Sequence, residues 1–319
     1  MTALQPLGRT EVRVSRLGVG AMTWGNPSGL SRYTPAKLAY GGAEGAEGEA
    51  RAFESSLAAG VNLFDTAAMY SNGASEERLG QLAGGTPAVI STKFPPGIRS
   101  TTDDLPAALE GSLTRLQRTS VDLYLHHFPS KRVDIPRLMS RMADAVDAGK
   151  VRAVGVSNYS ASQMRTAHAA LAERGIPLAA NQVQYSLLHR TPETNGVLDA
   201  CRELGATLMA YQPLASGALT GKYLTGPRPT GLRRMMPNFR RRQRESIGDV
   251  VALLREIGAG HNTGPAQVAL RWLIENDSVV PIPGAKNGAQ ARSNAEALSF
   301  SLTQGEVEAL SDATAAWRD

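Results

Sequence analysis

Residues 121–156, VDLYLHHFPSKRVDIPRLMSRMADAVDAGKVRAVGV, contain two short apolar runs separated by a helical pattern. The runs at 121–127 and 151–156 are largely apolar, which is typical of strands buried on both faces. Between them, 135–148 has the spacing of an amphipathic helix, and Gly149 follows where such a helix would end. The stretch therefore predicts a strand, a helix and a second strand in succession.

The same alternation extends over the 319 residues of the chain. The segment 7–21 predicts a hairpin that leads into a first strand. Further strands are predicted at 61–65, 88–93, 121–127, 151–156, 180–184, 207–211 and 279–282. Helices are predicted at 49–59, 75–83, 103–118, 135–148, 160–173, 192–204, 246–258, 265–276 and 288–297, with one more near the C-terminus.

Several helix boundaries carry recognisable signals. Ser160 with Gln163, and Thr303 with Glu306, form capping-box pairs ahead of helices. Pro265 suits a first helical turn, because its missing N–H has no partner to lose there. The glycines that stand where helices should stop are Gly60, Gly149, Gly175 and Gly205.

Eight strand–helix units predict an α/β protein with one (β/α)8 TIM barrel, an N-terminal β-hairpin and a C-terminal helix. We expect this barrel to be a single domain over residues 1–319. The rival fold is a doubly wound sheet with a dinucleotide fingerprint. That fingerprint is incomplete here, because residues 18–23, GVGAMT, lack its third glycine and no helix follows closely.

The composition excludes several classes of protein. Hydrophobic residues make up 42% and charged residues 20% of the chain, which excludes a disordered polypeptide. The single Cys201 excludes an internal disulfide framework and fits a reducing compartment. Residues 1–6 lack the pattern of a signal peptide, and no apolar stretch is long enough to span a membrane. We therefore expect a cytoplasmic protein.

The positive charge is concentrated in one segment. The formal charge of the chain is +5 and its pI is about 9.5. Residues 226–245 hold seven Arg and one Glu, so this segment alone carries more positive charge than the whole chain. Such a run can bind nucleic acid or other phosphates, or remain a solvated loop. Because Phe239 is its one aromatic residue, we do not expect a nucleic-acid partner. Residues 212–245 are too long for an ordinary loop, so we expect a functional insertion at the barrel rim. This segment is called the excursion below.

Four polar side chains converge at the carboxyl ends of three consecutive predicted strands. Asp65, Lys93 and His127 end the second, third and fourth strands, and Tyr70 follows Asp65 by five residues. The active site of such a barrel lies at this end. We expect Lys93 to lower the pKa of Tyr70, Asp65 to hold Lys93, and His127 to orient a carbonyl oxygen. This set suits proton donation to an oxygen that gains charge.

Other chemistries have weaker support. His126 and His127 are neighbours on one strand and point to opposite faces, so we expect no metal site. No Gly-x-Ser-x-Gly elbow is present, and Cys201 lies inside a predicted helix, which favours a structural role.

These residues resemble the motifs of the aldo-keto reductase superfamily over nearly the whole chain. The motifs are Asp65-Thr66-Ala67-x-x-Tyr70, Ser75-Glu76-Glu77-x-Leu79-Gly80, Ser91-Thr92-Lys93, Val121-Asp122-Leu123-Tyr124-x-x-His127-x-Pro129, Gly155-Val156-Ser157-Asn158, Asn181-Gln182, Tyr211-x-Pro213-Leu214-Ala215-x-Gly217-x-Leu219-x-Gly221-Lys222 and Pro283-Gly284-Ala285-Lys286-Asn287-x-x-Gln290-x-x-x-Asn294. The pattern is most similar to bacterial and plant-type reductases near the potassium-channel β-subunit branch.

The resemblance implies reversible hydride transfer between NADPH and a small carbonyl compound. It makes Tyr70 the acid/base, Lys93 and Asp65 its tuning pair, and His127 the orienting group. The implied cofactor contacts are Ser157, Asn158 and Gln182 at the nicotinamide amide, Tyr211 against its ring, Pro213, Leu214, Ser216 and Lys222 along the pyrophosphate, and Gly284, Lys286, Gln290 and Asn294 around the adenosine end. We expect Arg233 or Arg234 to clamp the cofactor phosphates.

Some positions depart from the family or have a second interpretation. Ser71 replaces the Gly that usually follows the Tyr, and Lys286 stands where many relatives have Arg. We expect Trp24, Met69 and Phe128 to line an apolar substrate pocket, with core packing as the alternative. Instead of contacting a cofactor, Ser157 and Asn158 could start the next helix. Tyr211 could likewise be a core aromatic residue at a strand end. The Gly- and Ala-rich loop 26–48 matches no family signature and is expected to lie over the substrate mouth or to be partly disordered.

Two other functions stay open from the sequence. The first is an NADPH-binding module that senses redox state and turns over slowly. The second is a barrel aldolase in which Lys93 forms a Schiff base, although a neighbouring Asp65 would keep the amine charged. Substrate, cofactor ratio and oligomeric state are not encoded in any motif.

Overall fold

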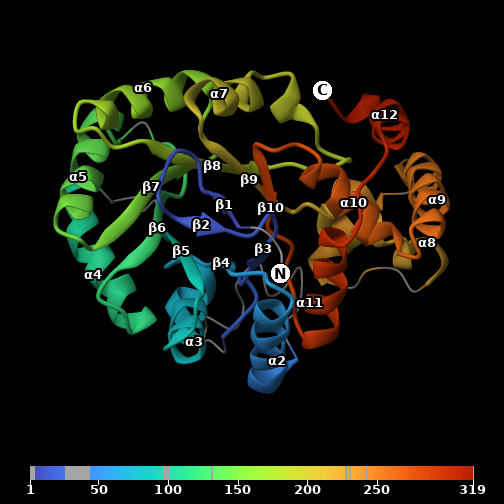
Figure 1. The fold of residues 1–319 in the computed structure, drawn as a ribbon, viewed down its shortest axis with the longest axis horizontal. Coiled ribbons are helices and arrows are strands. Elements are labelled where there is room, and N and C mark those ends of the chain that lie inside the picture. Colours follow the sequence, from blue (N-terminus) through green and yellow to red (C-terminus); the bar gives the residue numbers. More distant parts are fainter. Residues whose placement is uncertain are drawn as a thin grey trace.

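Most strands of the described chain form one parallel sheet that nearly closes on itself. The computed structural model describes residues 4–25, 44–95, 101–130, 132–226, 229, 231–240 and 243–318. Eight parallel strands follow one another in sequence order, and Gly20 at the end of the first bridges to Gly284 after the last. Figure 1 shows these strands at the centre of the molecule with the helices around them. The predicted (β/α)8 TIM barrel is confirmed.

The strands lie close to their predicted positions. The barrel strands are β3 (Gly18–Gly20), β4 (Leu63–Asp65), β5 (Val89–Phe94), β6 (Val121–His126), β7 (Val151–Ser157), β8 (Leu178–Gln184), β9 (Thr207–Tyr211) and β10 (Val279–Pro281). The N-terminal hairpin pairs β1 (Gln5–Pro6) with β2 (Arg13–Val14) in antiparallel register. It therefore begins just before the predicted segment 7–21.

The helices follow the strands as expected, with differences at their ends. The helices after barrel strands are α2 (Gly45–Ala58), α3 (Ala74–Ala83), α4 (Leu105–Leu116), α5 (Ile135–Asp147), α6 (Ala161–Ala172), α7 (Val197–Leu204), α9 (Arg244–Gly260), α10 (Pro265–Ile274) and α11 (Gly288–Ala295), and the C-terminal helix is α12 (Gln304–Ala313). The prediction for 192–204 was wrong in extent, because a 3-10 turn at Thr191–Glu193 precedes a shorter α7.

The predicted boundary signals are confirmed. Ser160 and Thr303 accept hydrogen bonds from the backbone N–H of Gln163 and Glu306 in complete capping boxes. Pro265 is the first residue of α10. The predicted stop glycines all have positive φ, with +81° at Gly60, +69° at Gly149, +67° at Gly175 and +66° at Gly205.

Two apolar layers hold the barrel together. The inner layer fills the barrel with side chains such as Leu63, Leu123 and Met209, and the hairpin residues Leu7 and Val14 pack against it. The hairpin thus covers one end of the barrel and leaves the opposite end, where the strands have their carboxyl termini, for the polar residues. The outer layer lies between strands and helices and includes Cys201, whose pKa burial raises to about 12. The lone thiol is a packing residue.

The excursion after β9 contains short helices that the sequence pattern did not predict. They are η5 (Ala215–Thr220), α8 (Lys222–Thr225), η6 (Gly231–Met235) and η7 (Pro237–Phe239). In Figure 1, α8 and α9 lie together at one side of the barrel. Arg228, Arg241 and Arg242 of the basic segment lie outside the described residues, as does 26–43 of the first loop, while 45–48 begin α2.

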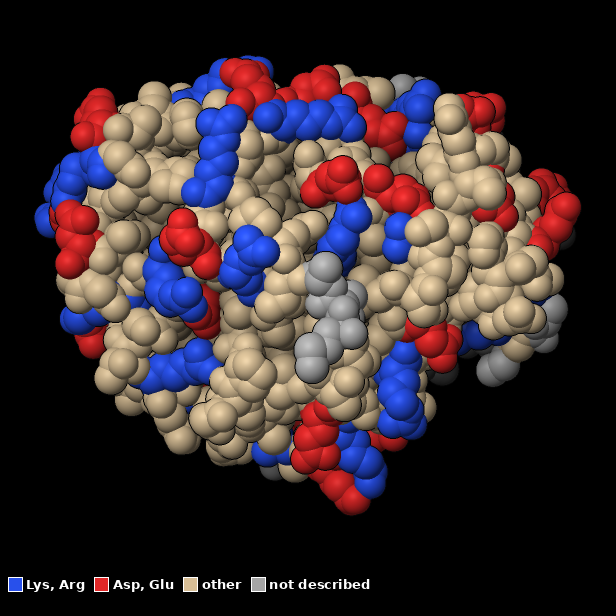
Figure 2. All heavy atoms as spheres, in the orientation of Figure 1, with Lys and Arg blue, Asp and Glu red and all other residues tan. Residues whose placement is uncertain are grey.

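The visible surface carries mixed charge. Figure 2 shows Lys and Arg interspersed with Asp and Glu over the face drawn there. Among the described residues, no helix combines the length and apolar character that a membrane span requires.

Candidate active site

Asp65, Tyr70 and Lys93 meet at the carboxyl ends of β4 and β5. The Lys93 ammonium is fully buried and donates to Asp65 Oδ2 at 2.7 Å and to the Thr66 carbonyl at 2.7 Å. It also lies 3.4 Å from the Tyr70 hydroxyl and 4.7 Å from the centre of the Tyr70 ring. Side chains on a strand alternate between faces, so Ser91 and Lys93 of β5 both point into the barrel toward Asp65.

The charge states of this group follow from burial and from the ion pair. Burial disfavours the charge of Lys93, but Asp65 and then Tyr70 outweigh it, so the pKa of Lys93 is raised and the ammonium stays protonated. The pKa of Tyr70 is also raised, because burial disfavours the phenolate more than Lys93 favours it. Lys93 lowers the pKa of Tyr70, as expected, but burial outweighs this effect and the net shift is upward. Tyr70 holds its proton at neutral pH.

His127 completes the group from β6. Its ring meets the Tyr70 ring edge-on, with centroids 5.7 Å apart. Burial first, and then the charge of Lys93, lower the pKa of His127 to about 2, so the imidazole is neutral. The preceding His126 points away, and its Nδ1 pairs with the Tyr159 hydroxyl at 2.7 Å. The predicted opposite orientation of the two histidines is confirmed.

Asp65 also accepts hydrogen bonds from two uncharged side chains. Its Oδ1 accepts from Ser91 Oγ and from Gln182 Nε2, each at 2.9 Å, while Oδ2 faces Lys93. Gln182, predicted as a cofactor contact, therefore also orients the carboxylate. Nothing in the sequence pattern pointed to this bond, because 117 positions separate the two residues.

Ser157, Asn158 and Tyr211 form one connected polar group at the ends of β7 and β9. Asn158 Nδ2 donates to Ser157 Oγ at 3.0 Å and to the His127 carbonyl at 3.1 Å, and Tyr211 donates to Asn158 Oδ1 at 3.0 Å. The following helix is capped by Ser160, so Ser157 and Asn158 do not start it. The alternative of a helix start at these two residues was therefore wrong. Tyr211 is partly exposed and also packs against the inner apolar layer, so the alternative of a core aromatic is confirmed in part.

The residues expected along the pyrophosphate lie on the contorted start of the excursion. Pro213 is buried, Leu214 and Ser216 are partly exposed, and Lys222 is exposed. Gln212, Ala215 and Ser216 have positive φ without being glycines, at +52°, +49° and +59°. Strained backbone of this kind concentrates at functional sites.

The residues expected at the adenosine end surround the start of α11. Gly284 is exposed, Lys286 is partly buried, and Gln290 accepts from the Lys286 backbone N–H at 3.0 Å. Asn294 Nδ2 donates to the Gly284 carbonyl at 3.3 Å. These four residues therefore share one small surface beside the closing edge of the barrel.

Two cations lie beside the ring of Tyr223. Lys222 Nζ lies 4.9 Å and the Arg233 guanidinium 5.9 Å from the centre of its ring. Burial first, and then the charges of Arg233 and Lys222, lower the pKa of Lys286, whereas Glu44 raises it. Lys222, Arg233 and Lys286 are here called the cationic cluster. Tyr223 was missed by sequence reasoning, although it directly follows the motif lysine.

The predicted substrate residues separate into two groups. Met69 is 48% and Phe128 40% exposed, and the Phe128 ring stacks on His127 with centroids 4.6 Å apart. Trp24 has no exposed surface and donates from Nε1 to the Ala285 carbonyl at 2.7 Å. The expectation that Trp24 lines the substrate pocket is therefore corrected: it is a core residue that ties the first strand to the last.

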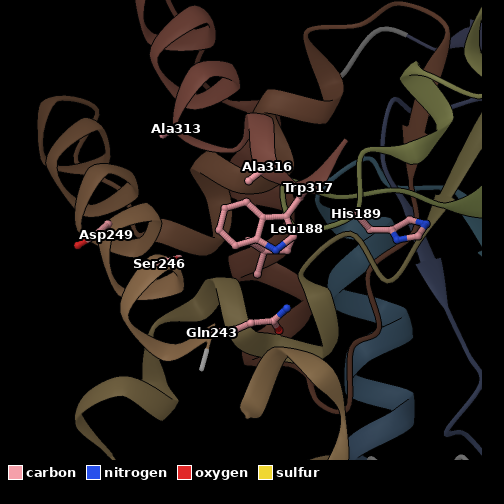
Figure 3. Close-up of a pocket in the computed structure, with 8 residues that line it drawn as sticks. All are labelled: Leu188, His189, Gln243, Ser246, Asp249, Ala313, Ala316 and Trp317. Atoms are coloured by element: carbon pink, nitrogen blue, oxygen red, sulfur yellow. The ribbon is translucent and has the colours of Figure 1, made fainter. Parts of the chain in front are cut away.

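A separate cavity of about 580 Å³ lies between α9 and the C-terminus. Figure 3 shows the Trp317 ring between the α9 side chains and His189. The lining residues are Leu188, His189, Gln243, Ser246, Asp249, Ala313, Ala316 and Trp317. None of them belongs to the predicted site, so this cavity is not the place where the polar residues converge.

Ser71 departs from the family pattern at a position where the backbone favours glycine. Its φ is +52°, it is 4% exposed, and its Oγ has no hydrogen-bond partner within the described part of the chain. Each of these features disfavours Ser in the folded state.

Replacing Ser71 with Gly is expected to stabilise the protein by about 1 kcal/mol. Relief of the left-handed backbone and of the unpaired hydroxyl outweighs the greater freedom of Gly in the unfolded chain. The midpoint of urea unfolding measures this, with Ser71→Ala as the control that removes only the hydroxyl. A Gly variant no more stable than wild type would contradict the prediction.

Comparison with known proteins gives one consistent result. A sequence model of the Aldo/keto reductase family matches residues 16–315. An uncharacterized oxidoreductase of Mycobacterium tuberculosis is 38% identical over 313 residues, which cover 96% of this chain and 91% of the relative. The aldo-keto reductase yakc [NADP(+)] of Schizosaccharomyces pombe is 32% identical over 273 residues, with 80% and 78% coverage. A crystal structure of a thermostable aldo-keto reductase superposes with a TM-score of 0.76 at 28% identity, covering 98% of this chain and 99% of that one. The chain therefore belongs to the aldo/keto reductase family.

Proposed function

We propose that the protein is an NADPH-dependent reductase that converts aldehydes or ketones to alcohols, with Tyr70 as the general acid/base. The observation that carries the proposal is the buried Lys93 ammonium, 2.7 Å from Asp65 and 3.4 Å from the Tyr70 hydroxyl. A protonated phenol beside a fixed cation is suited to give a proton to an oxygen that gains negative charge.

Each member of the group has a distinct part in that step. Tyr70 donates its proton to the substrate oxygen, and the adjacent Lys93 stabilises the phenolate that remains. Asp65 keeps Lys93 charged and in place. His127, with a pKa of about 2, offers a neutral hydrogen bond that orients the carbonyl oxygen without adding a competing acid.

The same electrostatics disfavour an aldolase. A Schiff base forms from a neutral amine, whereas the pKa of Lys93 is raised by its neighbours despite burial. Lys93 is therefore better suited to support Tyr70 than to attack a carbonyl carbon.

The residues present fit a dinucleotide with several phosphates. Within the cationic cluster, Arg233 and Lys222 disfavour the charge of Lys286, and a bound polyanion would relieve that repulsion. The relative from Schizosaccharomyces pombe carries NADP(+) in its name, which agrees with this assignment. When bound, NADPH supplies the hydride.

The remaining predicted contacts would hold the cofactor along the rim. Ser157 and Asn158, with Gln182, present amide and hydroxyl groups beside Asp65 and His127 for the carboxamide of the nicotinamide. Tyr211, fixed by its bond to Asn158, presents a partly exposed ring. Met69 and Phe128 give the substrate entrance an apolar character, which favours carbonyl compounds with apolar substituents.

The direct test is oxidation of NADPH and NADH with a panel of aldehydes, ketones, quinones, pyridoxal and sugars. We expect carbonyl-dependent oxidation of NADPH that is faster than that of NADH. If no carbonyl compound accelerates NADPH oxidation above the rate in buffer, the proposed activity is wrong.

Arg233→Gln is expected to weaken NADPH binding by about tenfold or more, because a charge-assisted hydrogen bond to phosphate contributes about 1.5–3 kcal/mol. Arg234→Gln is the matched control, because Arg234 neighbours Arg233 on η6 but is exposed. Fluorescence titration with NADPH at two salt concentrations measures both. Equal affinities for the two variants would contradict the assignment of Arg233 to the cofactor.

A further inference from the structure

The turn that carries Tyr70 is strained. After Tyr70, the chain passes through Ser71, Asn72 and Gly73 with φ of +52°, +56° and +89° before α3 begins. Two of these residues are not glycines, and the left-handed region is unfavourable for them. Such a turn persists only where surrounding contacts hold it.

Arg115 of α4 lies directly against this turn. A side chain at Gly73 would have its Cβ 2.6 Å from Arg115 Cδ, so only glycine fits beneath the arginine. Arg115 Nε in turn donates to Glu76 Oε2 at 2.7 Å. Glu76 belongs to the first turn of α3, and its side chain has no exposed surface. The arginine is thus fixed on one side by the turn and on the other by a buried carboxylate.

Glu76 connects this pair to the strand that carries Lys93. Thr92 Oγ1 donates to Glu76 Oε1 at 2.5 Å. Thr92 points outward from β5, whereas its neighbour Lys93 points into the barrel, as alternation along a strand requires. A continuous set of contacts therefore runs from the Tyr70 turn through Arg115 and Glu76 to the backbone beside Lys93.

We propose that Arg115, Glu76 and Thr92 are positioning residues that hold the Tyr70 hydroxyl at its distance from the Lys93 ammonium. This proposal rests on the proposed function for its consequence in catalysis. The turn after Tyr70 contacts Arg115, which donates to the Glu76 carboxylate, and Thr92 beside Lys93 donates to the same carboxylate. A shift of α3, which carries Glu76, therefore moves the Tyr70 hydroxyl relative to the Lys93 ammonium. The two side chains meet through the 3.4 Å contact and the approach of the ammonium to the ring at 4.7 Å.

The decisive variant is Thr92→Val, which keeps the shape of the side chain and removes its hydroxyl. Thr92→Ser is the rescue variant, because it restores the hydroxyl. Thr207→Val is the matched control: Thr207 is also a buried strand threonine, and its Oγ1 accepts from the Gly8 N–H at 2.8 Å, away from the site. Glu76→Gln is a second variant that weakens the pair while keeping its shape.

Two readouts separate the positioning role from the proposed function. Nuclear magnetic resonance of ring-labelled tyrosine, assigned with Tyr70→Phe, reports the surroundings of Tyr70 without substrate or cofactor. We expect Thr92→Val to shift the Tyr70 signal and its titration, Thr92→Ser to restore them, and Thr207→Val to leave them unchanged. In turnover, Thr92→Val is expected to lower kcat by about 10-fold to 100-fold with KM nearly unchanged.

The outcomes are decisive in each direction. A Tyr70 signal that is identical in wild type and Thr92→Val overturns the proposal. A shift of the Tyr70 signal that is as large in Thr207→Val as in Thr92→Val also overturns it, because it would show a general loss of stability. If the wild-type protein reduces no carbonyl compound, the proposed function fails, while the tyrosine signal still decides the positioning role.

Discussion

Tyr70→Phe is expected to lower the rate of NADPH-dependent carbonyl reduction by about 10²–10⁴-fold, the range that a positioned general acid contributes. The substitution removes the phenol that lies 3.4 Å from Lys93 and keeps the ring that packs against His127. The fold and the cationic cluster do not depend on that hydroxyl. We therefore expect the affinity for NADPH to change little while turnover is lost.

The measurement pairs steady-state reduction with NADPH titration on the same preparations. Tyr185→Phe is a suitable control, since it also removes the hydroxyl of a buried tyrosine. That hydroxyl donates to Glu193 at 2.9 Å, and Glu193 also accepts from Arg318 near the C-terminus. Undiminished carbonyl reduction by Tyr70→Phe would refute the role of Tyr70 as the acid.

Lys93→Met is expected to destabilise the protein by about 3–5 kcal/mol, because it leaves the Asp65 carboxylate buried without its cation. Lys93 is fully buried and the Asp65 side chain is 3% exposed, so water does not replace the lost partner. Turnover should fall as well, since the phenolate of Tyr70 loses its neighbouring charge.

The double variant Asp65→Asn/Lys93→Met separates the two effects. It removes both charges, so most of the stability should return while activity stays absent. Lys150→Met breaks an ion pair with Glu110 in which both side chains are about half exposed, and it is expected to cost about 1 kcal/mol or less. Urea unfolding compares all three variants. A Lys93→Met protein as stable as Lys150→Met would show that the buried pair is not what holds this end of the barrel.

The positions of the catalytic candidates followed from the sequence because barrel strands end at one face. Asp65, Lys93 and His127 each close a recognisable apolar run, so their convergence needed only the order of the strands. The protonation state of Tyr70 did not follow from the sequence. Its pKa depends on how completely the surrounding elements exclude water, and this burial outweighs the predicted lowering of the pKa by Lys93.

Trp24 failed as a substrate residue for a related reason. Its position after the first strand is correct for the rim, but its indole turns inward and bonds to Ala285, far away along the chain. The contacts of Lys222 and Arg233 with the Tyr223 ring, and the effect of both charges on Lys286, likewise depend on segments that are far apart along the chain. No local pattern encodes such contacts.

By itself, the sequence determined the barrel, the order of its strands, the helix caps and the identity of the four polar residues at the rim. These features depend on periodicity and on local backbone preferences, which act over a few neighbouring residues. Only the tertiary structure decided the protonation of Tyr70 and His127, the burial of Trp24 and the attachment of the Tyr70 turn to Glu76 and Thr92. These depend on desolvation and on contacts between distant segments, and both exist only once the chain has closed into a barrel.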